Sequence, residues 1–266
     1  MQTLKQALCE IEYFLLDMDG TVYLGDKLIG DMPKTLDALR SRGKKIIYLT
    51  NNSSKSKERY YEKLSRMDLL RDGDEVYSSG MATAEYLSAN YPENSVYLLG
   101  TRALGKEFKE RGIRLVDGRA DISVLAYDTE LTYEKLCKFT SNVMKGSRYI
   151  ATHPDVNCPA EDVFVPDAGA LIELVYASTG VRPELIIGKP YPFMGENLMK
   201  RFSLPPEKFV MVGDRLNTDI KFGRNCNFHT LLVLSGESAL TDVERLSPSD
   251  KPEFILDSLN DVVDYL

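Results

Sequence analysis

Residues 11–21 read Ile-Glu-Tyr-Phe-Leu-Leu-Asp-Met-Asp-Gly-Thr, an apolar run that ends at two carboxylates. Such runs are typical of buried strands, where two negative charges need a compensating reason. A turn at Gly20 can bring Asp17 and Asp19 near one reacting group. The pair therefore indicates Mg²⁺-assisted phosphoryl transfer at the carboxyl end of a strand, with an ordinary Asp-Gly turn as the alternative.

The composition excludes several classes of partner. The chain has 266 residues and a formal net charge of −7, with acidic and basic residues interspersed. We therefore expect no nucleic-acid partner and no anionic membrane surface, and a phosphate ester would have to be held by local cations. The four cysteines are scattered without a CxxC pair, and no stretch is as long as a membrane span. We expect a cytoplasmic protein with free thiols.

Short apolar runs alternate along the chain with segments of helical spacing, which predicts an α/β fold with mostly parallel sheets. The predicted strands are Tyr13–Leu16, Lys45–Leu49, Val96–Leu99, Ile122–Tyr127, Tyr149–Ala151, Leu185–Ile187, Phe209–Val212 and Thr230–Leu234. Predicted helices include Pro33–Arg42, one capped by Ser54 or Ser56, and one capped by Thr132. Possible hinges at Ser78–Gly80 and Thr179–Pro183 suggest an inserted domain.

Polar residues follow four of these apolar runs. The first run ends in Asp17-Met18-Asp19, the second in Thr50-Asn51-Asn52-Ser53, the sixth in Lys189-Pro190, and the seventh in Gly213-Asp214, with Asp219 soon after. The carboxyl ends of parallel strands share one edge of a sheet, which is where open α/β folds bind ligands. We therefore expect these side chains to converge in space.

The convergence suits phosphoryl transfer. A phosphate is repelled by each nearby carboxylate by about 4 kcal/mol at 4 Å and an effective dielectric near 20, so the site needs cations. Mg²⁺ and Lys189 can supply them, while Thr50 Oγ and the amide of Asn51 can donate to phosphoryl oxygens. Taken singly, Thr50 could be a helix cap, Lys189 a loop lysine and Asp214 a turn residue.

Together the four motifs resemble those of the haloacid-dehalogenase-like superfamily of aspartate-nucleophile phosphatases. The motifs are Asp17-Met18-Asp19-Gly20-Thr21, Leu49-Thr50-Asn51-Asn52-Ser53, Gly188-Lys189-Pro190, and residues 212–220. The last two, with Tyr23 and Gly25, look like the NagD or 4-nitrophenylphosphatase branch. The resemblance implies a Rossmann-like three-layer core with a parallel sheet and an inserted α/β cap, giving core residues 1–80, cap residues 81–182 and core residues 183–266.

The resemblance also implies roles for single residues. Asp17 would be the nucleophile that forms an aspartyl-phosphate, and Asp19 would protonate the leaving group and then activate water. Mg²⁺ would be held by Asp17, the backbone carbonyl of Asp19, and Asp214. Substrate binding would fall to Thr50, Asn51, Asn52 and Lys189, while Asp219 would orient Lys189 or a metal-bound water.

The cap would select the substrate, and its expected contact loop is residues 151–155. Branch members usually have asparagine where His153 stands and a Pro-Gly pair where this chain has Pro166-Asp167. We predict His153 as a contact to the leaving group, with a polar loop residue outside the chemistry as the alternative. Because both departures lie in the part that would face the leaving group, the resemblance does not identify the substrate.

The leading hypothesis is a Mg²⁺-dependent phosphatase acting on a small phosphorylated metabolite. The alternatives are a phosphosugar mutase and a phosphate-ligand binding protein without turnover. Nucleotides, sugar phosphates, glycerol phosphate and pyridoxal phosphate all remain candidate substrates. The sequence does not give the oligomeric state, because a cap can pair with its copy in a homodimer without an obvious signature.

Overall fold

The computed structural model describes residues 3–159 and 163–266. It divides the chain into two compact units. The first comprises Met1–Thr50, Tyr60–Tyr77 and Lys189–Leu266, and the second comprises Asn51–Arg59 and Ser78–Gly188. Each unit has its own sheet and its own hydrophobic core. Within the described residues, no helix combines the length and apolar character that crossing a membrane requires.

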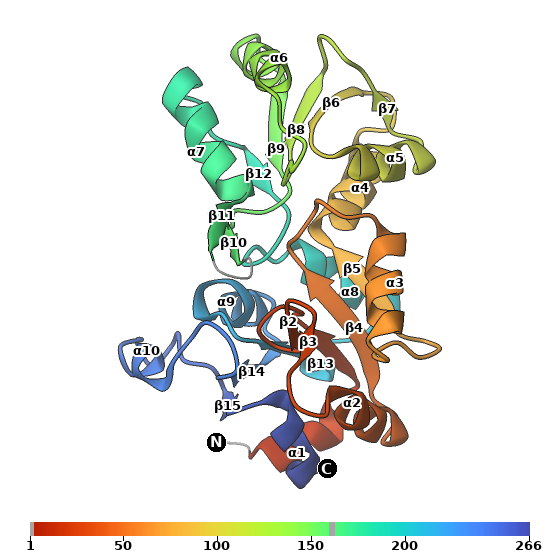
Figure 1. The fold of residues 1–266 in the computed structure, drawn as a ribbon, viewed down its shortest axis with the longest axis vertical. Coiled ribbons are helices and arrows are strands. Elements are labelled where there is room, and N and C mark those ends of the chain that lie inside the picture. Colours follow the sequence, from red (N-terminus) through yellow and green to blue (C-terminus); the bar gives the residue numbers. More distant parts are fainter. Residues whose placement is uncertain (1–2, 160–162) are drawn as a thin grey trace. The chain divides into compact units, whose positions relative to one another are not determined.

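The first unit is built on a six-stranded sheet with the strand order β15-β14-β13-β1-β4-β5. All of its strands except β1 are labelled in Figure 1. Its strands are β1 (Tyr13–Leu16), β4 (Lys45–Thr50), β5 (Glu75–Ser78), β13 (Phe209–Gly213), β14 (His229–Val233) and β15 (Phe254–Leu256). β1 pairs in parallel with both β4 and β13, so Leu16 lies between Tyr48 and Val212. β14 continues the parallel pairing to β15. The carboxyl ends of β1, β4 and β13 therefore meet at one edge.

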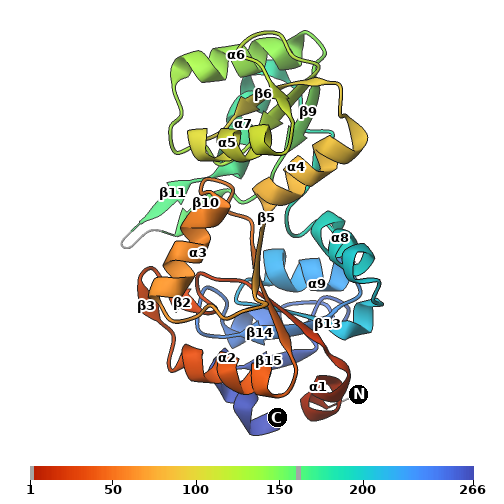
Figure 2. The same ribbon diagram turned by 90° about the vertical axis from the view of Figure 1, so that its right-hand side faces the viewer.

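Helices cover both faces of this sheet, which gives the three layers expected (Figure 2). Phe14 and Leu16 point to the face that carries α1 (Leu4–Glu10), α2 (Met32–Ser41) and the last helical turns, Leu259–Tyr265. Tyr13 points to the opposite face, where it stacks on Phe202 at the end of α8 (Phe193–Phe202). This alternation follows from the pleat of a strand that is buried on both sides.

The remaining elements of the first unit are short and lie between its strands. They are the hairpin β2 (Tyr23–Leu24) and β3 (Lys27–Leu28), a π-helical turn at Leu216–Ile220, α9 (Lys221–Asn225), α10 (Leu240–Glu244) and a 3₁₀ turn at Pro206–Lys208. α3 (Lys57–Arg66) spans the division between the units.

The second unit is built on a five-stranded parallel sheet with the order β12-β9-β8-β6-β7. Its strands are β6 (Ser95–Leu99), β7 (Arg114–Leu115), β8 (Ile122–Leu125), β9 (Arg148–Ala151) and β12 (Leu185–Ile186). Its helices are α4 (Ser79–Asn90), α5 (Arg102–Glu110), α6 (Tyr133–Met144) and α7 (Ala168–Thr179), with a hairpin of β10 (Asn157–Pro159) and β11 (Phe164–Pro166). α6 and α7 pack together on β8 over Phe139, Leu171 and Val175.

The α/β class with parallel sheets is confirmed, and each of the eight predicted apolar runs forms a strand. Thr132 caps α6 as expected, and Ser56 rather than Ser54 precedes α3 and accepts from Arg59 N. The chain returns to the first unit after Gly188, six residues beyond position 182, because β12 pairs with β9 and so belongs to the second sheet.

Candidate active site

The centre of the first unit's site is a buried lysine between two carboxylates. Lys189 Nζ lies 2.6 Å from Asp17 Oδ1 and 2.6 Å from Asp219 Oδ1, and it donates to the carbonyl of Leu49 at 3.2 Å. Lys189 is only 1% exposed. Four segments distant in sequence thus meet. Three of them lie at or after the ends of β1, β4 and β13, which share one sheet edge, whereas Lys189 follows β12 of the second sheet.

The charge of Lys189 is stabilised by these neighbours. Burial alone would lower the pKa of Lys189, but Asp17 and Asp219 raise it above its usual range. Asp219 is itself fixed, because its Oδ2 accepts from the backbone N–H of Arg215 at 3.2 Å. Asp219 Oδ1 lies 2.6 Å from Lys189 Nζ, which is the contact through which Asp219 would orient Lys189.

Asp214 is held against the same edge by tight turns. Its Oδ2 accepts from the backbone N–H of Glu237 at 2.7 Å. Gly20 has φ +89°, and a Cβ there, or at Gly236, would overlap the Asp214 carboxylate. The close approach explains why glycine stands at both positions. Among the residues that the structure describes, Asp214 Oδ1 is a buried oxygen with no hydrogen-bond partner.

These carboxylates fit a divalent metal ion. One oxygen each of Asp17, Asp214 and Asp219 can lie within 4.8 Å of the others. Mg²⁺ prefers such oxygen ligands, and the unpartnered Asp214 Oδ1 supplies one. The donor set in the described residues therefore suits Mg²⁺, with Asp17 and Asp214 the nearest match to the ligands expected from the sequence.

The carboxyl pKa values also favour a cation. Burial raises the pKa of Asp17 well above its usual range; Lys189 opposes the rise, and the charges of Asp219 and Asp214 add to it. Burial and the charge of Asp219 raise the pKa of Asp214 to about 6. A bound cation would reverse both rises and keep the two groups ionised.

The other predicted residues are divided between the units. Asp19 is exposed and lies in the turn after β1, where it forms an isolated bridge with Tyr23. Thr50 is buried at the end of β4 in the first unit. Asn51 and Asn52 follow it in the chain and belong to the second unit. Asn51 donates to Asp155 Oδ2 at 3.1 Å, and Asn52 accepts from Ser54.

His153 is fully buried in the second unit, and its ring has polar neighbours on both sides. Its Nε2 lies 2.8 Å from Asp167 Oδ1, and its Nδ1 lies 2.9 Å from Thr152 Oγ1. The two positions at which the sequence departs from the branch pattern are thus hydrogen-bonded to each other. His153, Asp155 and Asp167 also have the spacing of metal ligands, but both ring nitrogens of His153 are already engaged by Thr152 and Asp167.

The loop after β14 contributes contacts that the sequence reasoning missed. Ser235 Oγ donates to the carbonyl of Gly20 at 2.8 Å, and Glu237 binds both the Asp214 carboxylate and Arg215. A signal for this loop was present. The eighth apolar run ends in Leu234 and is followed directly by Ser-Gly-Glu at the same sheet edge.

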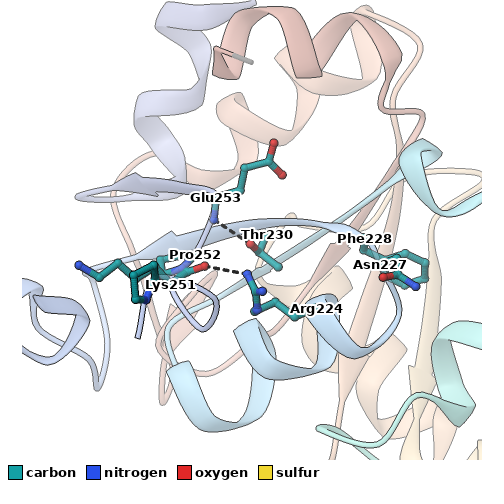
Figure 3. Close-up of a pocket in the computed structure, with 8 residues that line it drawn as sticks. Arg224, Asn227, Phe228, Thr230, Lys251, Pro252 and Glu253 are labelled. Carbon is teal, nitrogen blue, oxygen red and sulfur yellow. Dashed lines mark hydrogen bonds between the residues drawn. The ribbon is translucent and has the colours of Figure 1, made fainter. Parts of the chain in front are cut away.

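A cavity of about 590 Å³ lies elsewhere in the first unit (Figure 3). Its lining includes Arg224 of α9 and the segments that precede β14 and β15. Arg224 donates to the carbonyl of Lys251 at 3.0 Å, and Glu253 N donates to Thr230 Oγ1 at 2.9 Å (Figure 3). The cavity borders the amino ends of these parallel strands, so it lies at the edge opposite Asp17 and Lys189.

Family models match most of the chain. A model described as haloacid dehalogenase-like hydrolase matches residues 14–114, and one described as HAD-hydrolase-like matches residues 186–262. An acid sugar phosphatase of Staphylococcus aureus (strain MRSA252) is 37% identical over 251 residues, which cover 94% of this chain and 96% of the relative.

Solved structures share the fold over nearly the whole length. A 4-nitrophenylphosphatase from Thermotoga maritima superposes with a TM-score of 0.92 at 41% identity, covering 97% of this chain and 98% of that one. A glycerol phosphate phosphatase from Mycobacterium tuberculosis, solved in complex with magnesium, has a TM-score of 0.87 at 27% identity. The match covers 97% of this chain and 78% of the mycobacterial chain.

Proposed function

The chain belongs to the haloacid dehalogenase-like hydrolase family as a phosphatase, and we propose that it hydrolyses small phosphate monoesters through an aspartyl-phosphate on Asp17. The observation that carries the proposal is the contact of Lys189 with both Asp17 and Asp219, beside the unpartnered oxygen of Asp214. These groups supply a nucleophile, a fixed cation and a place for a metal ion.

The proposed chemistry has two steps. In the first, an Asp17 carboxylate oxygen bonds to phosphorus while the bond to the leaving oxygen breaks, and Asp19 gives that oxygen a proton. In the second, Asp19 takes a proton from water, whose oxygen bonds to phosphorus and releases inorganic phosphate and free Asp17. Thr50, Asn51 and Asn52 bind the phosphoryl group with Lys189.

Mg²⁺ is the proposed cofactor, held by Asp17, Asp214 and the backbone carbonyl of Asp19. When bound, it would neutralise carboxylate charge and stabilise the charge that develops on the phosphoryl oxygens. The magnesium complex of the mycobacterial relative and the fit of the acidic cluster support this assignment.

Sugar phosphates and similar polyol phosphates are the proposed substrate class. The support is the names of the relatives, an acid sugar phosphatase and a glycerol phosphate phosphatase. Those names also favour transfer of the phosphoryl group to water over the mutase reaction. We propose residues 81–182 of the second unit as the cap that selects among these substrates.

The first test replaces the nucleophile. Asp17→Asn should abolish release of phosphate from 4-nitrophenyl phosphate, because an amide cannot form the aspartyl-phosphate. Asp257→Asn is the matched control, since Asp257 is an exposed aspartate that follows β15 at the same sheet edge. β15 lies three strands from β1, or roughly 14 Å. Near wild-type turnover by Asp17→Asn would show that the mechanism is wrong.

The second test separates the two steps. Asp19→Asn should still release one equivalent of 4-nitrophenol, because that leaving group needs little help from an acid, and then stall. The stalled protein should carry one phosphoryl group by mass spectrometry. Steady turnover without a burst would argue against Asp19 as the base of the second step.

A further inference from the structure

A buried polar cluster in the second unit connects the segment after β4 with the segment after β9. It consists of Ser53, Ser79, Thr152, His153 and Asp167, all with 3% of their surface exposed or less. Ser53 lies in the segment that follows β4, whereas Thr152 and His153 follow β9. Buried polar groups of this kind must satisfy one another, so the cluster fixes its members in one arrangement.

The outer end of the cluster is anchored on a helix. Asp167 is the N-cap of α7, and its Oδ1 accepts from Ala168 N at 2.5 Å and faces His153 Nε2 at 2.8 Å. Because a carboxylate can only accept, the proton on this contact belongs to His153 Nε2. The ring is therefore held at a fixed angle by the first turn of a twelve-residue helix.

The inner end of the cluster reaches residues 51–53. His153 Nδ1 lies 3.3 Å from Ser79 Oγ, which donates to the backbone carbonyl of Asn51. Thr152 Oγ1, 2.9 Å from the same nitrogen, lies 3.1 Å from Ser53 Oγ. Ser79 thus links the imidazole to the backbone of Asn51, and Thr152 links it to the side chain of Ser53.

Close packing reinforces this path. A Cβ at Gly188 would lie 2.6 Å from Asn51 Oδ1 and 2.8 Å from His153 Cβ, so the three residues leave no room to shift independently. The Asn51 side chain is also tied to Asp155 at 3.1 Å, two residues beyond His153. The packing around Gly188 therefore couples the position of His153 to that of Asn51.

We propose that His153 and Asp167 are a positioning pair that sets the backbone of Asn51 through the hydroxyl of Ser79 and holds the neighbouring Ser53 side chain through Thr152. The inference rests on the proposed function, in which Asn51 helps to bind the phosphoryl group. It replaces direct contact of His153 with the leaving group. Loss of the pair should lower kcat more than it raises KM, because a misplaced donor weakens transition-state binding most.

The test compares substitutions of two buried polar side chains of the second unit, His153 and Asn142. His153→Ala should lower kcat for 4-nitrophenyl phosphate roughly tenfold or more, since an error of about 1 Å in placement can cost as much as a hundredfold. Asn142→Ala is the control. Asn142 is buried and holds Ala120 N and the carbonyl of Gly118, far along the chain from residues 51–53. The Asn142→Ala variant should show faster amide hydrogen exchange in the second unit but an unchanged kcat.

Two further variants test the route. Ser79→Ala removes the hydroxyl that donates to Asn51, so it should lower kcat, and His153→Ala should add little to that loss in the double variant. His153→Asn keeps an amide near the position of Nδ1 and should restore kcat to within about threefold of wild type. A purely structural role would instead give losses that multiply and follow stability.

The outcomes separate this inference from the proposed function. If Asp17→Asn is inactive and His153→Ala keeps kcat within twofold of wild type, the positioning pair is refuted and the phosphatase stands. If Asn142→Ala loses as much kcat as His153→Ala, the effect belongs to general loosening and the inference is again refuted. If Asp17→Asn remains active, the proposed function itself fails.

Discussion

Replacing Lys189 with methionine should destabilise the metal-free first unit strongly and in a pH-dependent way. The substitution leaves the buried Asp219 and the partly buried Asp17 without the cation that lies 2.6 Å from each. Breaking a buried ion pair typically costs about 3–5 kcal/mol. The loss of unfolding free energy is limited, because one of the two carboxylates can bind a proton and become neutral. At pH 7, protonating a group of ordinary pKa near 3.9 costs about 4 kcal/mol.

The cost of protonating that carboxylate also predicts how the stability of the variant changes with pH. In the variant, the folded pKa of a carboxyl is raised above its unfolded value, so the protein regains stability as the pH falls toward the unfolded pKa. The difference from wild type should shrink from about 4 kcal/mol at pH 7 to about 1.5 kcal/mol at pH 5. The assay is urea unfolding in EDTA, read by pulsed hydrogen exchange of β1 and β13 peptides at one fixed labelling pH.

Lys44→Met provides the matched control. Lys44 is also partly buried in the first unit, but its Nζ donates to the backbone carbonyls of Leu8 and Ile11. Its loss should cost about 1–3 kcal/mol, with no recovery at low pH, because no carboxylate is left unpaired. A loss below about 1 kcal/mol for Lys189→Met at pH 7, or one that does not shrink at pH 5, would refute the buried ion-pair account.

Three further results should follow. Mg²⁺ affinity by calorimetry should fall roughly tenfold per pH unit below about 6, because the raised pKa of Asp214 lets a proton compete with the metal; a flat affinity contradicts this. Gly20→Ala should weaken Mg²⁺ binding at least tenfold, since its Cβ overlaps the Asp214 carboxylate, and unchanged affinity would show that the turn can adapt. In a thiol titration, exposed Cys9 and Cys137 should react at once and Cys226 only after unfolding, because burial raises its pKa; early reaction of Cys226 would contradict that burial.

The sequence predicted the long elements well because their patterns are local. Buried parallel strands are continuous apolar runs, and all eight predicted runs proved to be strands. The short pieces escaped, among them the three-residue strand β15 and the hairpins β2–β3 and β10–β11, because two or three residues carry no periodicity. The seven-residue α1, capped by Thr3, was also missed, although Leu4, Ala7 and Leu8 have the spacing of one helix face.

The site was predictable where a topological rule applied. Asp17 and Asp219 were expected together because they follow β1 and β13, which lie in one sheet, and the structure brings them together. Lys189 joins them as predicted, but for another reason than the one given, because it follows β12 of the second sheet. The topological rule could not predict that His153 is buried. Its partners lie 14 residues away at Asp167 and 74 residues away at Ser79, and no spacing along the chain encodes either contact.

The charge of the assembled site argues independently for a metal ion. Asp17, Asp214 and Asp219 carry three negative charges when ionised, and Lys189, at 2.6 Å from two of them, offsets one. The remaining charge of −2 would repel a phosphate dianion by several kcal/mol at an effective dielectric near 20. The raised pKa values of Asp17 and Asp214 express the same excess of negative charge. A divalent cation brings the cluster to neutrality, so inorganic phosphate should bind measurably in Mg²⁺ and far more weakly in EDTA.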